Sequence, residues 1–403
     1  MKRLLVLAAG LLQIPVIKKA KDLGYYVIAA DGDSMAPGLK CADRAVVANI
    51  TSEELMLDIA RKEKIDGIIH PCSEVAMNVM GRINDELGLC GISRETALKA
   101  TNKHLMRKAF EEGNAPSPWS ECFEFVDDAW QIYEKTLTQD MILKPSRNSG
   151  SRGISKISKG MKKSEFEILF ERSKAESRDN TVMLEQFVEG PEFSVEIIVW
   201  QKRIYILAVT DKKTTGAPYF VELGHNQPSC YPDSIVEKIK QAAYQGVVAL
   251  KLDNCAAHAE IKLNEGNAYI MEVGARLGGD FISTELTRLS TGIDMVAAAV
   301  NVALGVEPDL RSKEPKYGVC IRYFCPTPGK VVGIENENFL KKDPSVYNYE
   351  IYHREGDMVH DVKSSLDRSG HVIVIEETPM QAINHAEKLI NTVKIKTIQG
   401  CGI

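Results

Sequence analysis

The first hundred residues repeat a pattern that limits the possible folds more than any other feature of the sequence. Short apolar runs alternate with stretches of helical spacing, and these runs are LLVLA (4–8), YVIAAD (26–31), AVVA (45–48) and GIIH (67–70). Strands that alternate with helices build a parallel sheet with helices on both faces. The sequence therefore predicts a doubly wound α/β domain that binds ligands at the carboxyl ends of its strands.

Composition excludes several classes of protein. The chain has 403 residues, enough for about two to four domains of roughly 150 residues each. Its 50 Lys and Arg against 55 Asp and Glu give a net charge of −5, which argues against a nucleic-acid partner. No apolar run approaches the roughly 20 residues that cross a bilayer, so we expect no membrane partner. The nine cysteines form no CxxC pair, which indicates reduced thiols in a cytoplasmic protein.

Changes of pattern divide the rest of the chain. A turn at APSP (115–118) is followed by short strands and two helices, then by a strand-rich stretch, and the pattern changes again near 313–317. We expect an N-terminal domain at 1–100, a small subdomain at 101–190, a larger one at 191–310 and an α+β domain at 311–403.

The turn after the first strand, AAGLLQIP (8–15), has one glycine of the dinucleotide pattern G-x-G-x-x-G. A tight strand–helix turn explains it better than an NAD site, so a dehydrogenase is disfavoured. Gln13 still lies at the ligand-facing edge and is a candidate substrate residue.

Two lysines indicate phosphate binding. Lys144 ends the strand MILK and precedes the Gly/Ser-rich loop PSRNSGSRG (145–153), and Lys103 begins a helix upstream. Flexible backbone N–H groups beside an ammonium suit phosphates, although the loop is not a Walker A sequence and could be a surface hairpin. Further on, LEQFVEGPEFSVE (184–196) offers backbone to an adenine edge and Glu192 to ribose hydroxyls, with a plain strand–turn–strand as the simpler alternative.

The most specific pattern is a pair of acidic strands. Glu260 lies in HAEIKL and Glu272 in YIMEVGAR, and Gly266–Asn267 forms the expected hairpin turn between them. Antiparallel pairing would put the two carboxylates side by side, where they repel unless a bound Mg²⁺ offsets them. The alternative is a solvated acidic hairpin.

Several polar residues near this hairpin are candidates for substrate contact. Arg276 follows it and could hold a phosphate or a carboxylate as a fork. Gly278, Gly279 and Asp280 come next, and His225 in ELGHNQPS could orient a substrate, although a lone loop histidine is usually just exposed.

In this order, the segments with Lys103, Lys144, LEQFVEGPEFS and HAEIKL…MEVGARLGGD resemble the ATP-grasp superfamily, from the N-terminal domain to about residue 310. Within this superfamily, the segments GHNQPS and GARLGGDFI look most like the L-amino-acid ligases, a branch of the carboxylate–amine ligases. The resemblance implies an ATP-grasp fold of mixed α/β and α+β class. A doubly wound pre-ATP-grasp domain would lie at its N-terminus and a β-rich domain at its C-terminus.

The resemblance also implies a role for each matching residue. ATP phosphates would be held by Lys103 and Lys144 and covered by Ser149, Gly150, Ser151 and Gly153. Glu185 and Val188 would frame the adenine and Glu192 the ribose, while Glu260 and Glu272 would hold Mg²⁺, with Mn²⁺ as a possible substitute. Arg276 would bind the transferred phosphate. One departure is clear: the family's E-x-N-x-R is Glu272-Val-Gly274-Ala-Arg276 here, so the Asn ligand is missing.

The function implied is an ADP-forming ligase that joins a small-molecule carboxylate to an amine through an acyl phosphate. Phosphoribosylglycinamide synthetases share the architecture but differ at both glycine-containing turns, so they rank second. A non-catalytic ATP-binding protein is a third possibility, because Gly274 replaces a metal ligand. A homodimer is the default for such enzymes.

Overall fold

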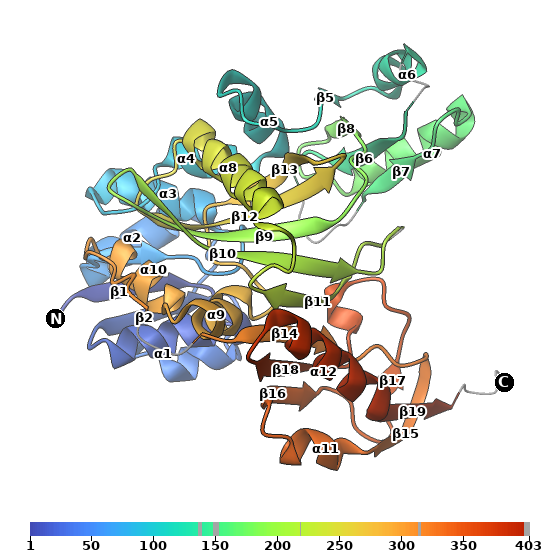
Figure 1. The fold of residues 1–403 in the computed structure, drawn as a ribbon. Coiled ribbons are helices and arrows are strands. Elements are labelled where there is room, and N and C mark those ends of the chain that lie inside the picture. Colours follow the sequence, from blue (N-terminus) through green and yellow to red (C-terminus); the bar gives the residue numbers. More distant parts are fainter. Residues whose placement is uncertain (136–138, 148–152, 218, 313–315, 399–403) are drawn as a thin grey trace.

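A computed structural model of the chain describes residues 1–135, 139–147, 153–217, 219–312 and 316–398. The N-terminal sheet is parallel, in the order β3-β2-β1-β4. Figure 1 labels β1 and β2 of this sheet. Its strands are β1 (Arg3–Leu7), β2 (Tyr26–Asp31), β3 (Arg44–Val47) and β4 (Gly67–Ile69). The alternation of strands and helices predicted from the sequence is confirmed.

Helices cover both faces of this sheet. Leu4 and Val6 of β1 pack with α1 (Ile14–Asp22) and α10 (Met295–Ala303). The other face, with Leu5 and Leu7, packs against α2 (Glu53–Glu63) and α3 (Met77–Leu87). Because β1 is buried on both sides, its sequence is a continuous apolar run and does not alternate.

A second sheet is antiparallel, and the region that it builds, residues 120–186, is called the lid below. Its order is β5-β8-β6-β7, and its strands are β5 (Ser120–Phe123), β6 (Met141–Pro145), β7 (Ser155–Ile157) and β8 (Val182–Gln186). The helices α6 (Val126–Lys135) and α7 (Lys163–Ala175) pack on it through stacked aromatic rings of Tyr133, Phe166 and Phe170. The helices α4 (Arg94–Thr101) and α5 (Lys103–Glu112) connect the lid to the N-terminal domain.

The largest sheet has eight strands in the order β13-β12-β9-β10-β11-β14-β18-β16. The strands before residue 311 are β9 (Glu192–Trp200), β10 (Arg203–Thr214), β11 (Glu222–Gln227), β12 (Cys255–Asn264) and β13 (Asn267–Gly274). The others are β14 (Gly318–Tyr323), β16 (Val346–Ile351) and β18 (Gly370–Glu376). The sheet thus continues across the domain boundary expected at 311, and the division of the chain stays a prediction.

Helices and a small sheet complete the C-terminal half. The helix α8 (Asp233–Leu250) covers the large sheet, and α9 (Thr287–Thr291) follows β13. A three-stranded sheet orders β17-β15-β19, with β15 (Gly329–Glu335), β17 (Met358–Val359) and β19 (Lys394–Ile398). Beside it lie α11 (Glu337–Lys342) and α12 (Pro379–Thr392). The last helix begins with a capping box of Thr378 and Gln381.

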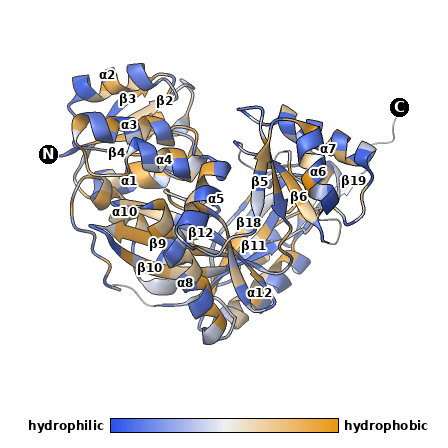
Figure 2. Cartoon of the chain, turned by 90° about the horizontal axis from the view of Figure 1, so that it is seen from above, coloured by the Kyte–Doolittle hydropathy of each residue, from blue (hydrophilic) through white to orange (hydrophobic). Residues whose placement is uncertain are grey.

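Hydropathy follows this layering. The helices of the N-terminal domain show polar and apolar sides, and apolar residues are frequent on the strands that they cover (Figure 2). Within the described ranges, no helix is both long and apolar enough to cross a membrane.

Candidate active site

A cavity of about 690 Å³ lies between the lid and the large sheet. Eight of the residues predicted as site residues line it: Lys103, Lys144, Glu185, Val188, Glu192, Glu260, Glu272 and Arg276. The cavity also receives Phe187 and Phe220, whose ring centroids are 6.4 Å apart. The fold therefore gathers predicted residues that are up to 173 positions apart, from Lys103 to Arg276, around one space.

The hairpin β12–β13 places two carboxylates side by side, as predicted. Glu260 pairs directly with Glu272 in the register, and a β-bulge follows between Glu260 and Ile261. The turn itself differs by one residue from the expected Gly266–Asn267. It consists of Glu265 and Gly266, with φ of 47° and 74°, because a tight two-residue hairpin turn of this kind needs positive φ at both positions.

Cations offset the repulsion between these carboxylates. Lys103 Nζ lies 2.5 Å from Glu272 Oε2, and Lys212 Nζ lies 3.1 Å from Glu260 Oε1. The charge of Lys212 holds the pKa of Glu260 well below its usual value. Burial acts to raise the pKa of Glu272, but Lys103 outweighs it and the pKa is lowered. Both carboxylates are therefore ionised at neutral pH.

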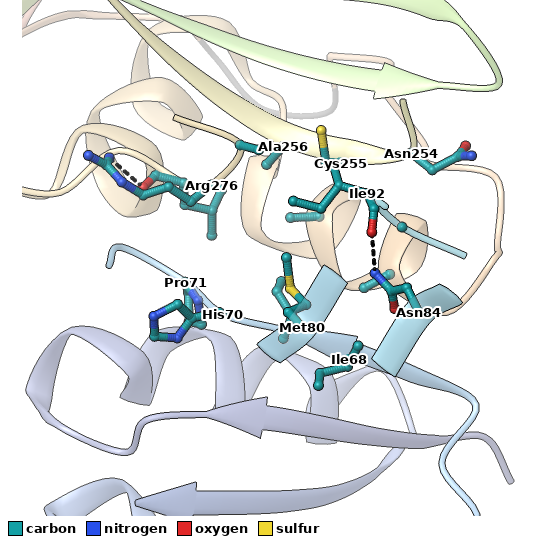
Figure 3. A pocket seen from close by; sticks show the side chains of 16 residues that line it. Ile68, His70, Pro71, Met80, Asn84, Ile92, Asn254, Cys255, Ala256 and Arg276 are labelled. Carbon is teal, nitrogen blue, oxygen red and sulfur yellow. Dashed lines mark hydrogen bonds between the residues drawn. The ribbon is translucent and has the colours of Figure 1, made fainter. Parts of the chain in front are cut away.

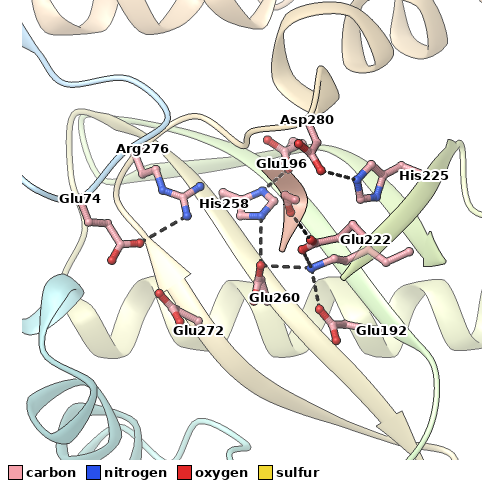
Figure 4. Close-up of polar contacts among 12 residues, drawn as sticks. Glu74, Glu192, Glu196, Glu222, His225, His258, Glu260, Glu272, Arg276 and Asp280 are labelled. Carbon is pink, nitrogen blue, oxygen red and sulfur yellow. Dashed lines mark hydrogen bonds and ion pairs between the residues drawn. The ribbon is translucent and has the colours of Figure 1, made fainter. Parts of the chain in front are cut away.

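Arg276 lies at the end of this hairpin and reaches toward Glu74 of the N-terminal domain, 3.3 Å away (Figure 4). Its side chain also lies beside Gly274, the position at which the family has Asn. A Cβ at Gly274 would lie 3.3 Å from Arg276 Cγ and 3.4 Å from Nε, so the guanidinium stem fills the space beside that glycine. Burial, together with the neighbouring Glu272, raises the pKa of Glu74.

On the lid side, two cations share one buried carboxylate. Glu185, which is 3% exposed, accepts hydrogen bonds from Lys144 Nζ (2.6 Å) and Arg107 Nε (2.8 Å). Burial lowers the pKa of Lys144 to about 8. The Glu185 side chain is thus engaged by these two cations, and contact of Glu185 and Val188 with an adenine stays a prediction.

Sequence reasoning missed Arg107, although a signal existed. It follows Lys103 by four residues on α5, so the two side chains share one face of the helix. Arg107 also donates to the carbonyl of Met271 on β13 (2.7 Å), and it therefore joins the helix to the acidic hairpin.

The predicted phosphate-covering loop is only partly described. Ser149, Gly150 and Ser151 lie outside the described residues. Gly153 has a φ of +74°, and a Cβ there would approach Glu176 Cβ to 2.8 Å, so this position requires glycine. Glu192, the predicted ribose ligand, lines the cavity with its carboxylate 2.6 Å from Lys212 Nζ.

A second polar cluster lies beside the cavity. His225 lies on β11 and is 1% exposed, which corrects the expectation of an exposed loop histidine. Its Nε2 lies 3.4 Å from Asp280 Oδ2, and Arg368 holds both oxygens of Asp280 at 2.6 and 2.8 Å. In the segment before Asp280, the backbone N–H of Gly278 donates to Ser283 Oγ (2.7 Å).

The five residues expected to contact substrate are separate from the eight predicted residues that line the cavity. Gln13, His225, Gly278, Gly279 and Asp280 are not among the described residues that line the large cavity. Gln13 donates to the carbonyl of Pro71 (3.0 Å). Their contact with a substrate stays a prediction.

Two buried residues behind the pair of Glu260 and Glu272 were also missed. His258 Nδ1 lies 2.5 Å from Glu196 Oε1, and its Nε2 lies 3.8 Å from Glu260 Oε1. Burial opposes protonation of His258, but Glu196 outweighs it and the pKa rises to about 9. The sequence HAEIKL could have indicated His258, because His258 and Glu260 are two residues apart on one strand and share a face of the sheet.

A smaller cavity of about 30 Å³ lies between β4, α3 and the start of β12 (Figure 3). Ile68, Met80 and Cys255 line it, and Asn84 donates to the carbonyl of Ile92 (3.0 Å). It has room for about one water molecule. The candidate active site is the cavity of about 690 Å³, because the eight predicted residues line it.

The donor set of the large cavity fits a magnesium ion. No group of three or more His, Cys, Asp or Glu side chains suited to a metal occurs among the described residues. Mg²⁺ usually takes one or two carboxylates and completes its shell with water and substrate phosphates. The opposed pair of Glu260 and Glu272 meets that requirement without a third protein ligand.

Comparisons with known proteins agree with this geometry. Residues 137–285 match the ATP-grasp domain, and residues 322–397 match the L-amino acid ligase C-terminal domain 2. Carnosine synthase 1 of Gallus gallus is 31% identical over 134 residues, which are 33% of this chain and 14% of that protein. Alanine–anticapsin ligase of Bacillus subtilis is 28% identical over 262 residues, 59% of this chain and 54% of that protein. The chain therefore spans about half or less of these two relatives.

Two solved structures share the whole fold. The L-amino acid ligase from Bacillus licheniformis has a TM-score of 0.83 at 20% identity, covering 99% of both chains. The phosphoribosylglycinamide synthetase from Anaerococcus prevotii has a TM-score of 0.79 at 24% identity, covering 98% of this chain and 100% of that one. These structures show the shared fold, and the two matched domains make this chain a member of the ATP-grasp superfamily that is similar to the L-amino acid ligases.

Proposed function

We propose that this protein is an ATP- and Mg²⁺-dependent ligase that joins a carboxylate, an amino acid, to an amine and releases ADP and phosphate. The observation that carries the proposal is the direct pairing of Glu260 with Glu272 in the cavity. Cations stand on either side of this pair, with Lys103 and Lys144 toward the lid and Arg276 at the strand end.

The first step joins two anions, and the site is built to offset their charge. A substrate carboxylate oxygen attacks the γ-phosphorus of ATP, the bond to the β-phosphate oxygen breaks, and ADP leaves with that electron pair. Lys103, Lys144 and Arg276 would hold the phosphates in line and neutralise the developing charge. Glu260 and Glu272 would hold Mg²⁺, which supplies further neutralisation of the phosphate oxygens.

The second step forms the amide. The amine nitrogen attacks the acyl carbon, the C–O bond to phosphate breaks, and the amine releases a proton. Arg276 would stabilise the departing phosphate. The closed lid would exclude water, which would otherwise hydrolyse the acyl phosphate.

The C-terminal match favours an amino-acid substrate over the purine alternative. Residues 322–397 match a domain of L-amino acid ligases, and β14 and β18 of this region extend the sheet that carries the site. The likeness to phosphoribosylglycinamide synthetase keeps phosphoribosylamine and glycine as the second candidate pair. A homodimer and a cytoplasmic location remain expectations, which size measurement and fractionation would test.

The test is ADP release from MgATP in the presence of amino-acid pairs, and of glycine with phosphoribosylamine. ADP and phosphate formed only when an acid and an amine are both present would support the ligase and name its class. AMP as product would contradict the acyl-phosphate mechanism. Tight ATP binding without turnover for any pair would favour the non-catalytic alternative.

A further inference from the structure

One buried lysine beneath the active site has no role in the function proposed above. Lys212 lies on β10 with its side chain only 3% exposed, and it is not among the residues lining the large cavity. Its Nζ lies 2.6 Å from Glu192, 3.1 Å from Glu260 and 3.5 Å from Glu222. All three of these carboxylates do line the cavity. Figure 4 shows Glu192, Glu222 and Glu260 close together.

The sheet explains why these groups converge. Lys212 pairs in register with Glu192 on β9, and Glu260 on β12 pairs with Ser194, two residues further along β9. Side chains two residues apart point to the same face of a strand, so Glu192, Glu260 and Lys212 share the cavity face. Glu222 joins from the start of β11, next to a β-bulge between Lys213 and Thr214.

The three carboxylates serve different purposes in the proposed reaction. Glu192 faces the ribose and Glu260 the metal, whereas Glu222 accepts a hydrogen bond from Ser365 of the C-terminal region (3.2 Å). The ammonium of Lys212 donates hydrogen bonds to Glu192 and Glu260 and forms a longer ion pair with Glu222, so one lysine contacts all three groups. Without a cation, three carboxylates this close would repel one another and separate.

We propose that Lys212 is a positioning residue that fixes the distance between the nucleotide carboxylate Glu192 and the metal carboxylate Glu260, and anchors both to Glu222. It does this from beneath the cavity, without touching the substrates. The inference rests on the proposed function for the roles of Glu192 and Glu260. The contacts and the burial of Lys212 do not depend on that function.

Nucleotide binding tests this role without requiring a known substrate pair. The affinity for ADP is measured with and without Mg²⁺ in the wild type and in Lys212→Met. Because second-shell partners of metal ligands typically contribute about 10–100-fold, we expect Lys212→Met to weaken MgADP binding by that factor. We also expect the gain in affinity that Mg²⁺ brings to shrink. Lys213→Met is the matched control, since Lys213 is 47% exposed and pairs with Glu387 away from the cavity.

A conservative variant separates positioning from charge balance. Lys212→Arg keeps the cation but replaces a three-donor point charge with a planar fork, so it should restore the melting temperature more than the MgADP affinity. If Lys212→Arg restores both equally, charge balance alone explains the residue and the proposal is wrong. If Lys212→Met does not fold, the double variant Lys212→Met/Glu222→Gln removes one repelling charge and carries the same measurement.

The remaining outcomes separate this inference from the proposed function. Wild-type binding of MgADP by folded Lys212→Met overturns the positioning role and leaves the ligase proposal intact. Tighter Mg²⁺-dependent binding in that variant also overturns it, because Lys212 would then only compete with the metal for Glu260. Failure of the wild type to bind MgADP would overturn both.

Discussion

Two ion clusters contribute side chains to the same cavity and have opposite balances of charge. On the lid side, Lys144 and Arg107 share the single carboxylate of Glu185. On the large sheet, Glu192, Glu222 and Glu260 share the single ammonium of Lys212. The first cluster has an excess of positive charge, which suits phosphates, and the second has an excess of negative charge, which suits a metal ion. The cavity is therefore polarised across the space where a metal–nucleotide would bind.

The comparison also separates stability from function. Glu185 is almost fully buried, so its ion pairs hold the lid core together, whereas the side chains of Glu192, Glu222 and Glu260 are 19–30% exposed and open to ligands. Removing a carboxylate should therefore have different results in the two clusters.

The largest expected effect is a loss of turnover when the charge of Glu272, beside the large-sheet cluster, is removed. Glu272→Gln keeps the shape of the side chain but removes the charge that balances Lys103 and that would hold Mg²⁺. We expect ADP release to fall by about 10³-fold, because transition-state charge would lose a metal-based stabilisation. Glu265→Gln at the tip of the same hairpin is the control and should retain full activity. A Glu272→Gln enzyme with more than about a tenth of wild-type activity would contradict the metal assignment.

The next effect is on stability and contrasts the clusters directly. Glu185→Gln leaves two buried cations without a charged partner, which should lower the free energy of unfolding by about 3 kcal/mol. Glu192→Gln removes one of three carboxylates around one lysine. It should change the free energy of unfolding by less than about 1 kcal/mol. Urea denaturation of both variants checks this, and equal losses would show that the two clusters do not differ as described.

A pH dependence follows from the positive side. Burial lowers the pKa of Lys144 to about 8, so its ammonium is present below that pH and is lost as the pH rises through it. The KM for ATP should therefore be flat up to about pH 8 and rise above it, approaching tenfold per pH unit. In Lys144→Arg the guanidinium stays charged, so the rise should disappear from this range. A wild-type profile that stays flat to pH 9.5 would contradict a phosphate-binding role for Lys144.

The sequence predicted the parts of this site that depend on local pattern. The opposed pair Glu260–Glu272 follows from two strands and a short turn, and its register is set within fifteen residues. The turn was misplaced by one residue, because Gly-Asn and Glu-Gly differ only in which residues take positive φ. The alternating N-terminal strands were found for the same reason, since each is a local apolar run.

What the sequence could not supply are partners that tertiary contacts bring together. Glu74 reaches Arg276 across 202 positions of the chain, and Lys212 meets Glu260 across 48. No periodicity links such residues, because their proximity depends on strand order in a sheet where β9 lies between β10 and β12. His225 was taken for a loop residue because the short strand β11 contains glycine and polar side chains and lacks the apolar alternation of its neighbours.

The smallest expected effect concerns the glycine that replaces the family's Asn. Gly274→Ala adds a Cβ 3.3–3.5 Å from the Arg276 side chain, which must then move by a few tenths of an ångström. Arg276 is tied to Glu74 and to the carbonyl of Leu277, so such a shift strains its rotamer and should lower kcat about threefold, with little change in the KM for ATP. Gly274→Asn, which restores the family pattern, should lower activity further, because the larger side chain competes with Arg276 for the same space. If Gly274→Asn instead raised kcat, the glycine would be a lost metal ligand and not an adaptation to the path of Arg276.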